Sequence, residues 1–114
     1  MPKLNDTGQR VSLDLHGMRV DDAIRLVRRT VQMAHQSGRA QVDVITGAST
    51  TRSDPQADTI KTRLTTLLQS GQIDHWVAHH RWSVDGGQCQ LVLPITRLNQ
   101  RGGKRITLRD VYRR

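Results

Sequence analysis

The sequence contains very few sulfur and aromatic side chains. Cys89 is its single cysteine, so no internal disulfide can form, and such cysteine usage is typical of the reducing cytoplasm. Phenylalanine is absent, and only two Trp and one Tyr are present. With 35% hydrophobic residues, the chain must build a small core from Val, Leu, Ile and Ala.

Glutamate and long hydrophobic runs are also missing. All ten acidic residues are Asp, whereas most of the 18 basic residues are Arg. No stretch approaches the roughly 18–20 apolar residues of a membrane-spanning helix, so we expect no membrane partner. The first residues carry charge with no apolar stretch behind it, which argues against a secretory signal and for a cytoplasmic location.

Positive charge is in excess and is concentrated near one end of the chain. The formal net charge of +8 on 114 residues favours a polyanionic partner, with nucleic acid as the first candidate. Residues 97–114 hold seven basic residues and one acidic residue, so they carry +6 of that charge. Coding bias and a solvated tail explain the same composition. The side chains that we predict to contact nucleic acid are Arg97, Arg101, Lys104, Arg105 and Arg109.

The hydrophobic pattern predicts one domain over residues 10–96, between a disordered lead-in at 1–9 and a basic tail at 97–114. The predicted elements are a strand from Arg10 to His16, a helix over 20–37, a strand over 41–45, a helix from Ser53-Asp54-Pro55 to Gly71, a strand over 74–82 and a last strand up to Pro94. A turn at Asp85-Gly86-Gly87 is expected to pair the last two strands as a hairpin.

The order β-α-β-α-β-β predicts an α/β two-layer sandwich with a mixed sheet. Two strands that are each followed by a helix require right-handed crossovers and a parallel portion of sheet. Val11, Leu13 and Leu15 alternate with polar residues, whereas a strand covered on both faces would be continuously apolar. We therefore expect both helices on one face of the sheet and an open, polar second face that suits nucleic acid.

Asp14 and His16 are candidates for chemistry at the end of the first predicted strand. Two residues apart on a strand, they leave the same face, at the carboxyl end where parallel α/β units place their sites. A carboxylate beside an imidazole can hold Mg²⁺ or orient a general base. Such spacing more often accompanies a structural role, with Asp14 on the open face and His16 in a turn.

The loop that follows the second predicted strand, Thr46-Gly47-Ala48-Ser49, is a second candidate. Parallel pairing would bring its start close to His16. Gly47 lets backbone N–H groups approach a phosphate, and the hydroxyls of Thr46 and Ser49 add donors, so these three residues form the predicted phosphate site. An ordinary strand-to-helix loop has the same composition, and the second Gly and Lys-Ser/Thr pair of a P-loop are missing.

Other residues that often carry chemistry are expected to be structural. His75 and His79, two of three histidines between 75 and 80, would lie about 13 Å apart on a strand, too far to share one metal ion, so no metal site is predicted there. Trp76 and Trp82 share one side of that strand, which favours core packing over base stacking. Cys89 is expected to be a small buried residue and not a nucleophile.

Several motifs together resemble the Smr (small MutS-related) domain family. Leu13-Asp14-Leu15-His16-Gly17-Met18, followed by an amphipathic helix, is similar to the LDLHG box of that family. Val44-Ile45-Thr46-Gly47 is similar to its TGxG or HGxG loop, and Trp76-Val77 with Asp85-Gly86-Gly87 and the strand to Leu93 resembles its closing segment. The likeness covers about Val11 to Pro94.

This resemblance implies a fold similar to the C-terminal domain of translation initiation factor 3. It also implies nucleic-acid binding, with metal-assisted nicking of DNA or cleavage of RNA, so Mg²⁺ is an expected cofactor. Bacterial domains of this kind are tied to recombination control and to mRNA cleavage at stalled ribosomes, which makes the ribosome an expected partner. The functional positions of the family fall on Asp14, His16, Thr46 and Gly47.

Two departures from the family pattern separate an endonuclease from its alternative. Ser49 and Cys89 stand where the family has glycine, and each would add a side chain where the backbone approaches its ligand. The alternative is therefore a non-catalytic module that binds nucleic acid or the ribosome.

Overall fold

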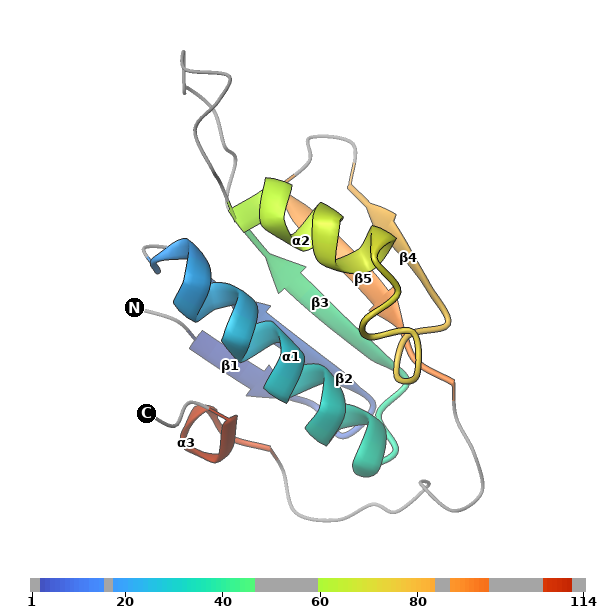
Figure 1. Cartoon of the computed structure of the whole chain (residues 1–114). Helices are drawn as coiled ribbons and strands as arrows, with labels where there is room; N and C mark the ends of the chain where they lie inside the picture. Colours follow the sequence, from blue (N-terminus) through green and yellow to red (C-terminus); the bar gives the residue numbers. More distant parts are fainter. Residues whose placement is uncertain (1–2, 16–17, 47–59, 84–86, 95–105, 112–114) are drawn as a thin grey trace.

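A five-stranded mixed sheet forms one layer of the protein (Figure 1). The computed structural model describes residues 3–15, 18–46, 60–83, 87–94 and 106–111. The elements along the chain are β1 (Lys3–Asp6), β2 (Arg10–Asp14), α1 (Val20–Gln36), β3 (Gln41–Ile45), α2 (Ile60–Gln69), β4 (His79–Trp82), β5 (Gln88–Val92) and α3 (Leu108–Val111). The strands lie side by side in the order β1-β2-β3-β5-β4.

The pairing of the strands confirms the predicted mixed sheet. β2 and β3 are parallel and are joined through α1, whereas the other neighbouring strands are antiparallel. β4 and β5 pair as the hairpin prediction requires, although residues 84–86 of the predicted turn lie outside the described residues. The predicted helix start at Ser53-Asp54-Pro55 lies outside them as well.

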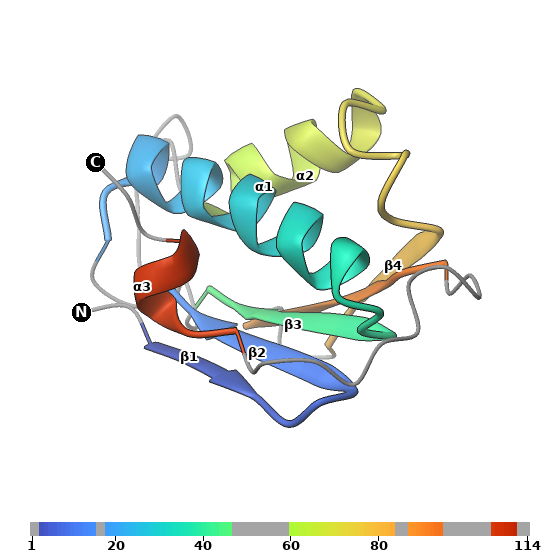
Figure 2. The ribbon, with the colours of Figure 1, turned by 90° about the horizontal axis from the view of Figure 1, so that it is seen from below.

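The helices cover one face of the sheet, so the two-layer prediction is confirmed (Figure 2). The sheet contributes to the core the fully buried side chains of Val11, Leu13, Val42, Val44, Cys89 and Leu91. The helices contribute Ala23, Leu26, Val27, Val31, Ala34, Leu64, Leu67 and Leu68. On α1 these apolar residues recur at three- and four-residue steps, which places them on one side of a helix.

Glycine ends both long helices, as predicted. Gly38 follows α1 and Gly71 follows α2, each with a φ of 76°, a left-handed conformation that side chains with a Cβ rarely adopt. No helix in the described part of the chain is long and apolar enough to span a membrane.

The second face of the sheet is polar, as expected. One row of paired residues crosses all five strands: Asn5, Ser12, Asp43, Gln90 and Arg81. Asp43 is nevertheless buried, because Arg10 forms an ion pair with it at 3.4 Å and the Gln41 amide donates a hydrogen bond to it at 2.6 Å. The carboxylate is thus held by polar neighbours on its own face of the sheet.

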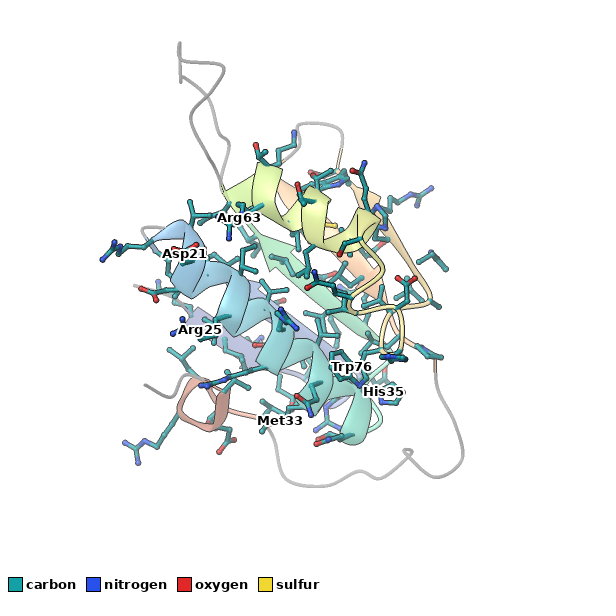
Figure 3. All side chains as sticks on the ribbon, in the orientation of Figure 1. Asp21, Arg25, Met33, His35, Arg63 and Trp76 are labelled. Carbon is teal, nitrogen blue, oxygen red and sulfur yellow. The ribbon has the colours of Figure 1, made fainter. Side chains whose placement is uncertain are left out.

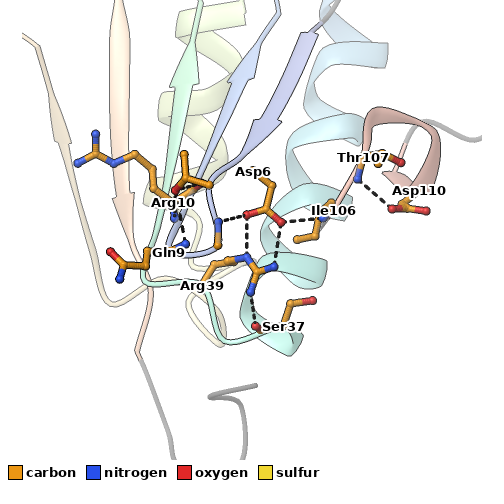
Figure 4. Close-up of polar contacts among 10 residues, drawn as sticks. Asp6, Gln9, Arg10, Ser37, Arg39, Ile106, Thr107 and Asp110 are labelled. Carbon is orange, nitrogen blue, oxygen red and sulfur yellow. Dashed lines mark hydrogen bonds and ion pairs between the residues drawn. The ribbon is translucent and has the colours of Figure 1, made fainter. Parts of the chain in front are cut away.

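The lead-in that was expected to be disordered contains the strand β1, so that prediction is wrong. β1 pairs antiparallel with β2, and Leu4 stands opposite Leu13 and packs against the core. Asp6, at the end of β1, is buried and accepts two hydrogen bonds from the Arg39 guanidinium, at 2.8 and 2.9 Å (Figure 4). These contacts lie far apart in sequence, and the polar segment 1–9 shows no alternation that reveals them.

Part of the predicted tail is also folded against the domain. The N–H of Ile106 donates to Asp6 at 2.6 Å (Figure 4), and Ile106 and Val111 are buried. α3 packs against β1 and α1. The folded unit therefore extends beyond 10–96 on both sides, whereas residues 97–105 and 112–114 lie outside the described residues.

β4 begins at His79, five residues later than the predicted strand. Consecutive turns separate α2 from β4: the N–H of Asp74 bonds to the carbonyl of Gly71 at 3.2 Å, and the N–H of Val77 bonds to that of Ile73 at 3.1 Å. Ile73 and Val77 are buried in the core. The apolar residues whose spacing predicted a strand here therefore lie on the buried side of these turns.

Candidate functional site

Three chain segments meet at the carboxyl ends of the parallel strands β2 and β3. Asp14, the last residue of β2, stands opposite Ile45, the last residue of β3. Backbone pairing continues beyond both strands. The N–H of Leu15 donates to the carbonyl of Ile45 at 2.9 Å, and the N–H of Thr46 donates to the carbonyl of Gly87 at 2.9 Å. The first motif, the second motif and the loop before β5 thus share one edge of the sheet, which we call the carboxyl edge.

Asp14 lies at the carboxyl edge on the polar face of the sheet. It alternates with the buried residue Leu13, and its side chain is half-buried. β2 ends at Asp14, so the strand is shorter than predicted, and the chain turns immediately with the N–H of Met18 bonded to the carbonyl of Leu15 at 3.1 Å. His16 lies outside the described residues, and its placement on the same face as Asp14 stays a prediction.

Thr46 links the second motif to the loop before β5. Its backbone N–H and its hydroxyl both point to the carbonyl of Gly87, at 2.9 and 3.3 Å. Two hydrogen bonds to one acceptor fix where the loop after β3 begins. Direct contact of Thr46 with a phosphate stays a prediction, and the other two residues of the predicted phosphate site, Gly47 and Ser49, lie outside the described residues.

Gly87 belongs to the site but is not among the predicted site residues. The residue pattern predicts its turn as a hairpin connection, and the family resemblance alone places that closing segment near a ligand. Its position follows from the antiparallel pairing of β5 with β3, which brings the residue before β5 opposite the residue after β3 and which the residue pattern does not predict.

Cys89 lies in the core and not at the carboxyl edge. It is 0% exposed, on the helix-covered side of β5, with Val44 and Trp82 as its cross-strand neighbours. It is therefore buried, as predicted, and burial raises the pKa of its thiol to about 11, which argues against a nucleophile. The expectation that its side chain obstructs a ligand site is wrong, because that side chain points into the protein.

The histidines and tryptophans near β4 are arranged differently from the prediction. His75 lies in the turns before β4, in edge contact with the Trp76 ring at 6.2 Å. Trp76 and Trp82 are both partly buried and pack against the core, which confirms the packing prediction for each. The Lys61 ammonium stands 5.4 Å from the centre of the Trp82 ring.

Asp14 is a carboxylate that the carboxyl edge offers to a Mg²⁺ ion. Mg²⁺ is usually held by one or two carboxylates, with waters and substrate phosphates completing its shell. Asp14 supplies a carboxylate, and no group of three His, Cys or Asp side chains gathers in the part of the chain that the structure describes. Mg²⁺ as a cofactor stays a prediction.

The predicted nucleic-acid contacts of the tail are described only in part. Arg109 is exposed on α3. The other four residues, Arg97, Arg101, Lys104 and Arg105, lie outside the described residues.

Comparison with known families gives one result. The family model of the Smr domain matches residues 13–89, about two thirds of the chain. Neither the comparison with curated proteins nor that with solved structures returned a match. The likeness to the C-terminal domain of translation initiation factor 3 accordingly stays a prediction. The matched segment begins in the first motif, includes the second and ends just after Gly87.

Proposed function

The chain belongs to the Smr domain family, and from that premise we propose that it is an endonuclease that cleaves RNA or nicks structured DNA at the carboxyl edge. Membership of this family indicates a nucleic-acid-binding module. The observation that supports cleavage is the pairing of Leu15 with Ile45 and of Thr46 with Gly87, which brings both motifs to one edge. A substrate phosphate there would meet groups from several segments at once.

The proposed chemistry assigns a role to each motif. His16 is the general base that takes a proton from a 2′-hydroxyl or from water, and Asp14 orients it. The backbone amide of Gly47 stabilises the charge that develops on the phosphate, and Thr46, whose N–H and hydroxyl both donate to the carbonyl of Gly87, positions the start of that loop. When bound, Mg²⁺ would supply positive charge to the phosphate oxygens.

A cleavage assay on the whole chain tests this proposal. The protein is incubated with labelled single-stranded RNA, duplex DNA and branched DNA, with and without Mg²⁺. Replacing a general base should slow cleavage by about 10²–10⁴-fold, so we expect His16→Ala to lose cleavage and to keep its affinity for the same substrates. His79→Ala is the matched control, because His79 is exposed on β4 and pairs with Val92 at the opposite end of the sheet. Equal cleavage by His16→Ala and the parent would exclude this role.

A non-catalytic binding module is the second candidate, and one observation favours it. Ser49 stands where the family has its second loop glycine. If that side chain blocks the phosphate, Ser49→Gly should convert a protein without measurable cleavage into one that cleaves. If the parent already cleaves and Ser49→Gly cleaves no faster, the non-catalytic candidate is excluded. Action on RNA at stalled ribosomes is a further part of the proposal, and cosedimentation of the protein with ribosomes tests it.

A further inference from the structure

A basic groove lies between α1 and α2, on the outer side of the helix layer (Figure 3). Its volume is about 470 Å³. The lining residues that matter here are Asp21, Arg25, Arg28, Arg29, Arg63 and Trp76. Figure 3 shows Asp21 and Arg63 at one end of this groove and Trp76 toward the other. The proposed reaction at the carboxyl edge uses none of these residues.

The groove is long enough to follow an extended chain. Asp21, Arg25, Arg28 and Gln32 line it at steps of four, three and four residues, which forms one stripe along α1. At 1.5 Å per residue, this stripe is about 17 Å long. An extended ligand can therefore contact several positions, where a compact ion would occupy one.

The charge of the groove is strongly positive. Its four Arg residues face one Asp, and the ion pair between Arg63 and Asp21, at 3.1 Å, balances one of these charges, so the lining keeps a net charge of +3. Arg28 donates to the neutral Gln72 side chain at 3.3 Å, which leaves its charge in place. Arg25 and Arg29 stand four residues apart on α1, a spacing at which like charges repel each other. A polyanion in the groove would relieve that repulsion.

Trp76 adds an aromatic surface to this positive groove. One part of its side chain packs against the core and holds the ring in place, while the residue as a whole is only partly buried. Arginines that bind phosphates beside an aromatic ring on which a base stacks are the combination by which proteins bind single-stranded nucleic acid. An acidic peptide would match the positive charge of the groove but has no base to stack on the Trp76 ring.

The polar face of the sheet is a weaker candidate for the same ligand. Its strands present Lys3, Arg10 and Arg81 against Asp14 and Asp43, so positive and negative charges nearly balance. Arg10 is further engaged by the buried carboxylate of Asp43. The groove therefore attracts phosphates more strongly than the face that the sequence favoured.

We propose that this groove binds the backbone of a single nucleic-acid strand, with arginines on its phosphates and one base stacked on Trp76. The groove reaches the first turn of α1 at Asp21, and α1 begins at Val20, shortly after the first motif. A strand that leaves the groove at this end is directed toward the carboxyl edge. That direction rests on the proposed function, whereas binding in the groove does not.

Binding measured by fluorescence anisotropy tests the groove independently of cleavage. The probes are a labelled oligothymidine of about 12 nucleotides and a duplex of the same length, at salt concentrations from about 50 to about 200 mM. We expect Arg25→Gln/Arg28→Gln to weaken binding of the single strand by about tenfold and to reduce the slope of log K against log salt by about 1.4, since each phosphate contact contributes about 0.7. The parent should prefer the single strand over the duplex.

The matched control removes the same charge from the opposite face. Lys3→Gln/Arg81→Gln changes two exposed basic residues of the sheet and should leave the salt slope of the parent almost unchanged. An equal loss in both double variants would mean that net charge alone binds the strand, and it would overturn the proposal. Equal affinity of the parent for duplex and single strand would overturn the choice of ligand.

Tryptophan fluorescence tests base stacking directly. In Trp82→Phe, Trp76 is the remaining tryptophan, and we expect saturable quenching on addition of the oligothymidine. In Trp76→Phe, which retains Trp82, we expect little quenching. Polyaspartate of similar length should cause no quenching, and tighter binding of polyaspartate would point to an acidic protein instead. Because these measurements need no cleavage, failure of the His16→Ala assay and failure of the groove are separate results.

Discussion

Asp6 is the residue through which the two ends of the folded unit are joined. Its carboxylate receives the Arg39 guanidinium and the N–H groups of Gly8 and Ile106. Burial by itself raises the pKa of this carboxyl group, but these hydrogen bonds favour its charged form and hold the pKa below the ordinary value of 3.8. The ion pair is almost fully buried, with side-chain exposures of 1% for Arg39 and 0% for Asp6.

The pKa of Asp6 predicts how stability depends on pH. A carboxyl group whose pKa is lowered by folding contributes its full stabilisation above its unfolded pKa and loses it as the pH falls through the folded pKa. We therefore expect the free energy of unfolding to decrease as the pH is lowered below about 3.8. Asp6→Asn should be less stable than the parent near neutral pH and should lose less on acidification. Urea unfolding at about pH 5 and about pH 3 measures both effects, with Asp74→Asn, at an exposed turn, as the control. Identical acid losses in Asp6→Asn and the parent would contradict this role of Asp6.

Cys89 stands where the family has glycine, and the effect of that difference depends on whether the cysteine side chain points into the core or toward a ligand. Since it is fully buried with a pKa of about 11, its thiol should react with iodoacetamide at about pH 8 only when the protein unfolds. Cys89→Gly removes a core side chain and places glycine inside a strand, so the free energy of unfolding should fall by about 2 kcal/mol. Cleavage should not increase. A gain of cleavage in Cys89→Gly, measured in the native protein, would restore Cys89 to the ligand site.

At the scale of elements, α3 is short but completes the cover over β1. It spans Leu108–Val111 and contacts both β1 and α1. Ile106 and Val111 are 4% and 1% exposed, and burying each side chain contributes about 1.5–3 kcal/mol. Deleting residues 97–114 would therefore remove this contribution to the core together with the basic side chains.

Truncation before Ile106 should therefore destabilise the fold. We expect the free energy of unfolding to fall by at least about 3 kcal/mol, because two core side chains and one hydrogen bond to Asp6 are lost. Urea unfolding measures the loss. Arg109→Gln, at an exposed position of the same helix, is the control and should stay within about 0.5 kcal/mol of the parent. A truncated protein as stable as the parent would show that α3 contributes nothing to the fold.

The helices and strands differ in how well their own sequences predict them. α1 could be predicted because its apolar residues repeat along 17 residues and Gly38 follows it. β1 could not, because Leu4 is an isolated apolar residue and the strand depends on pairing with β2 and on Arg39. Periodicity reveals an element that buries one side along its length, whereas β1 has a single apolar residue and is stabilised by contacts with distant segments.

At the scale of the whole molecule, the sequence predicts some functional features but not others. Parallel pairing of β2 with β3 was enough to predict that Asp14 and Thr46 leave the sheet at one edge. The groove could not be predicted, because it needs Arg63 of α2 and Trp76 of the following turn to meet the arginines of α1. On α1 alone, Arg25, Arg28 and Arg29 are typical of an ordinary solvated helix face.

The strand order has a consequence for self-association. An unpaired strand edge is a template on which another chain can add, and the two outer strands here, β1 and β4, have four residues each. On β4 that edge carries His79, His80 and Arg81, all exposed, whereas on β1 the edge carries the exposed residues Lys3 and Asn5. Short outer strands with charged and polar side chains offer a second copy little backbone to pair with. The protein should therefore remain monodisperse at concentrations where a longer, apolar edge would begin to form fibres.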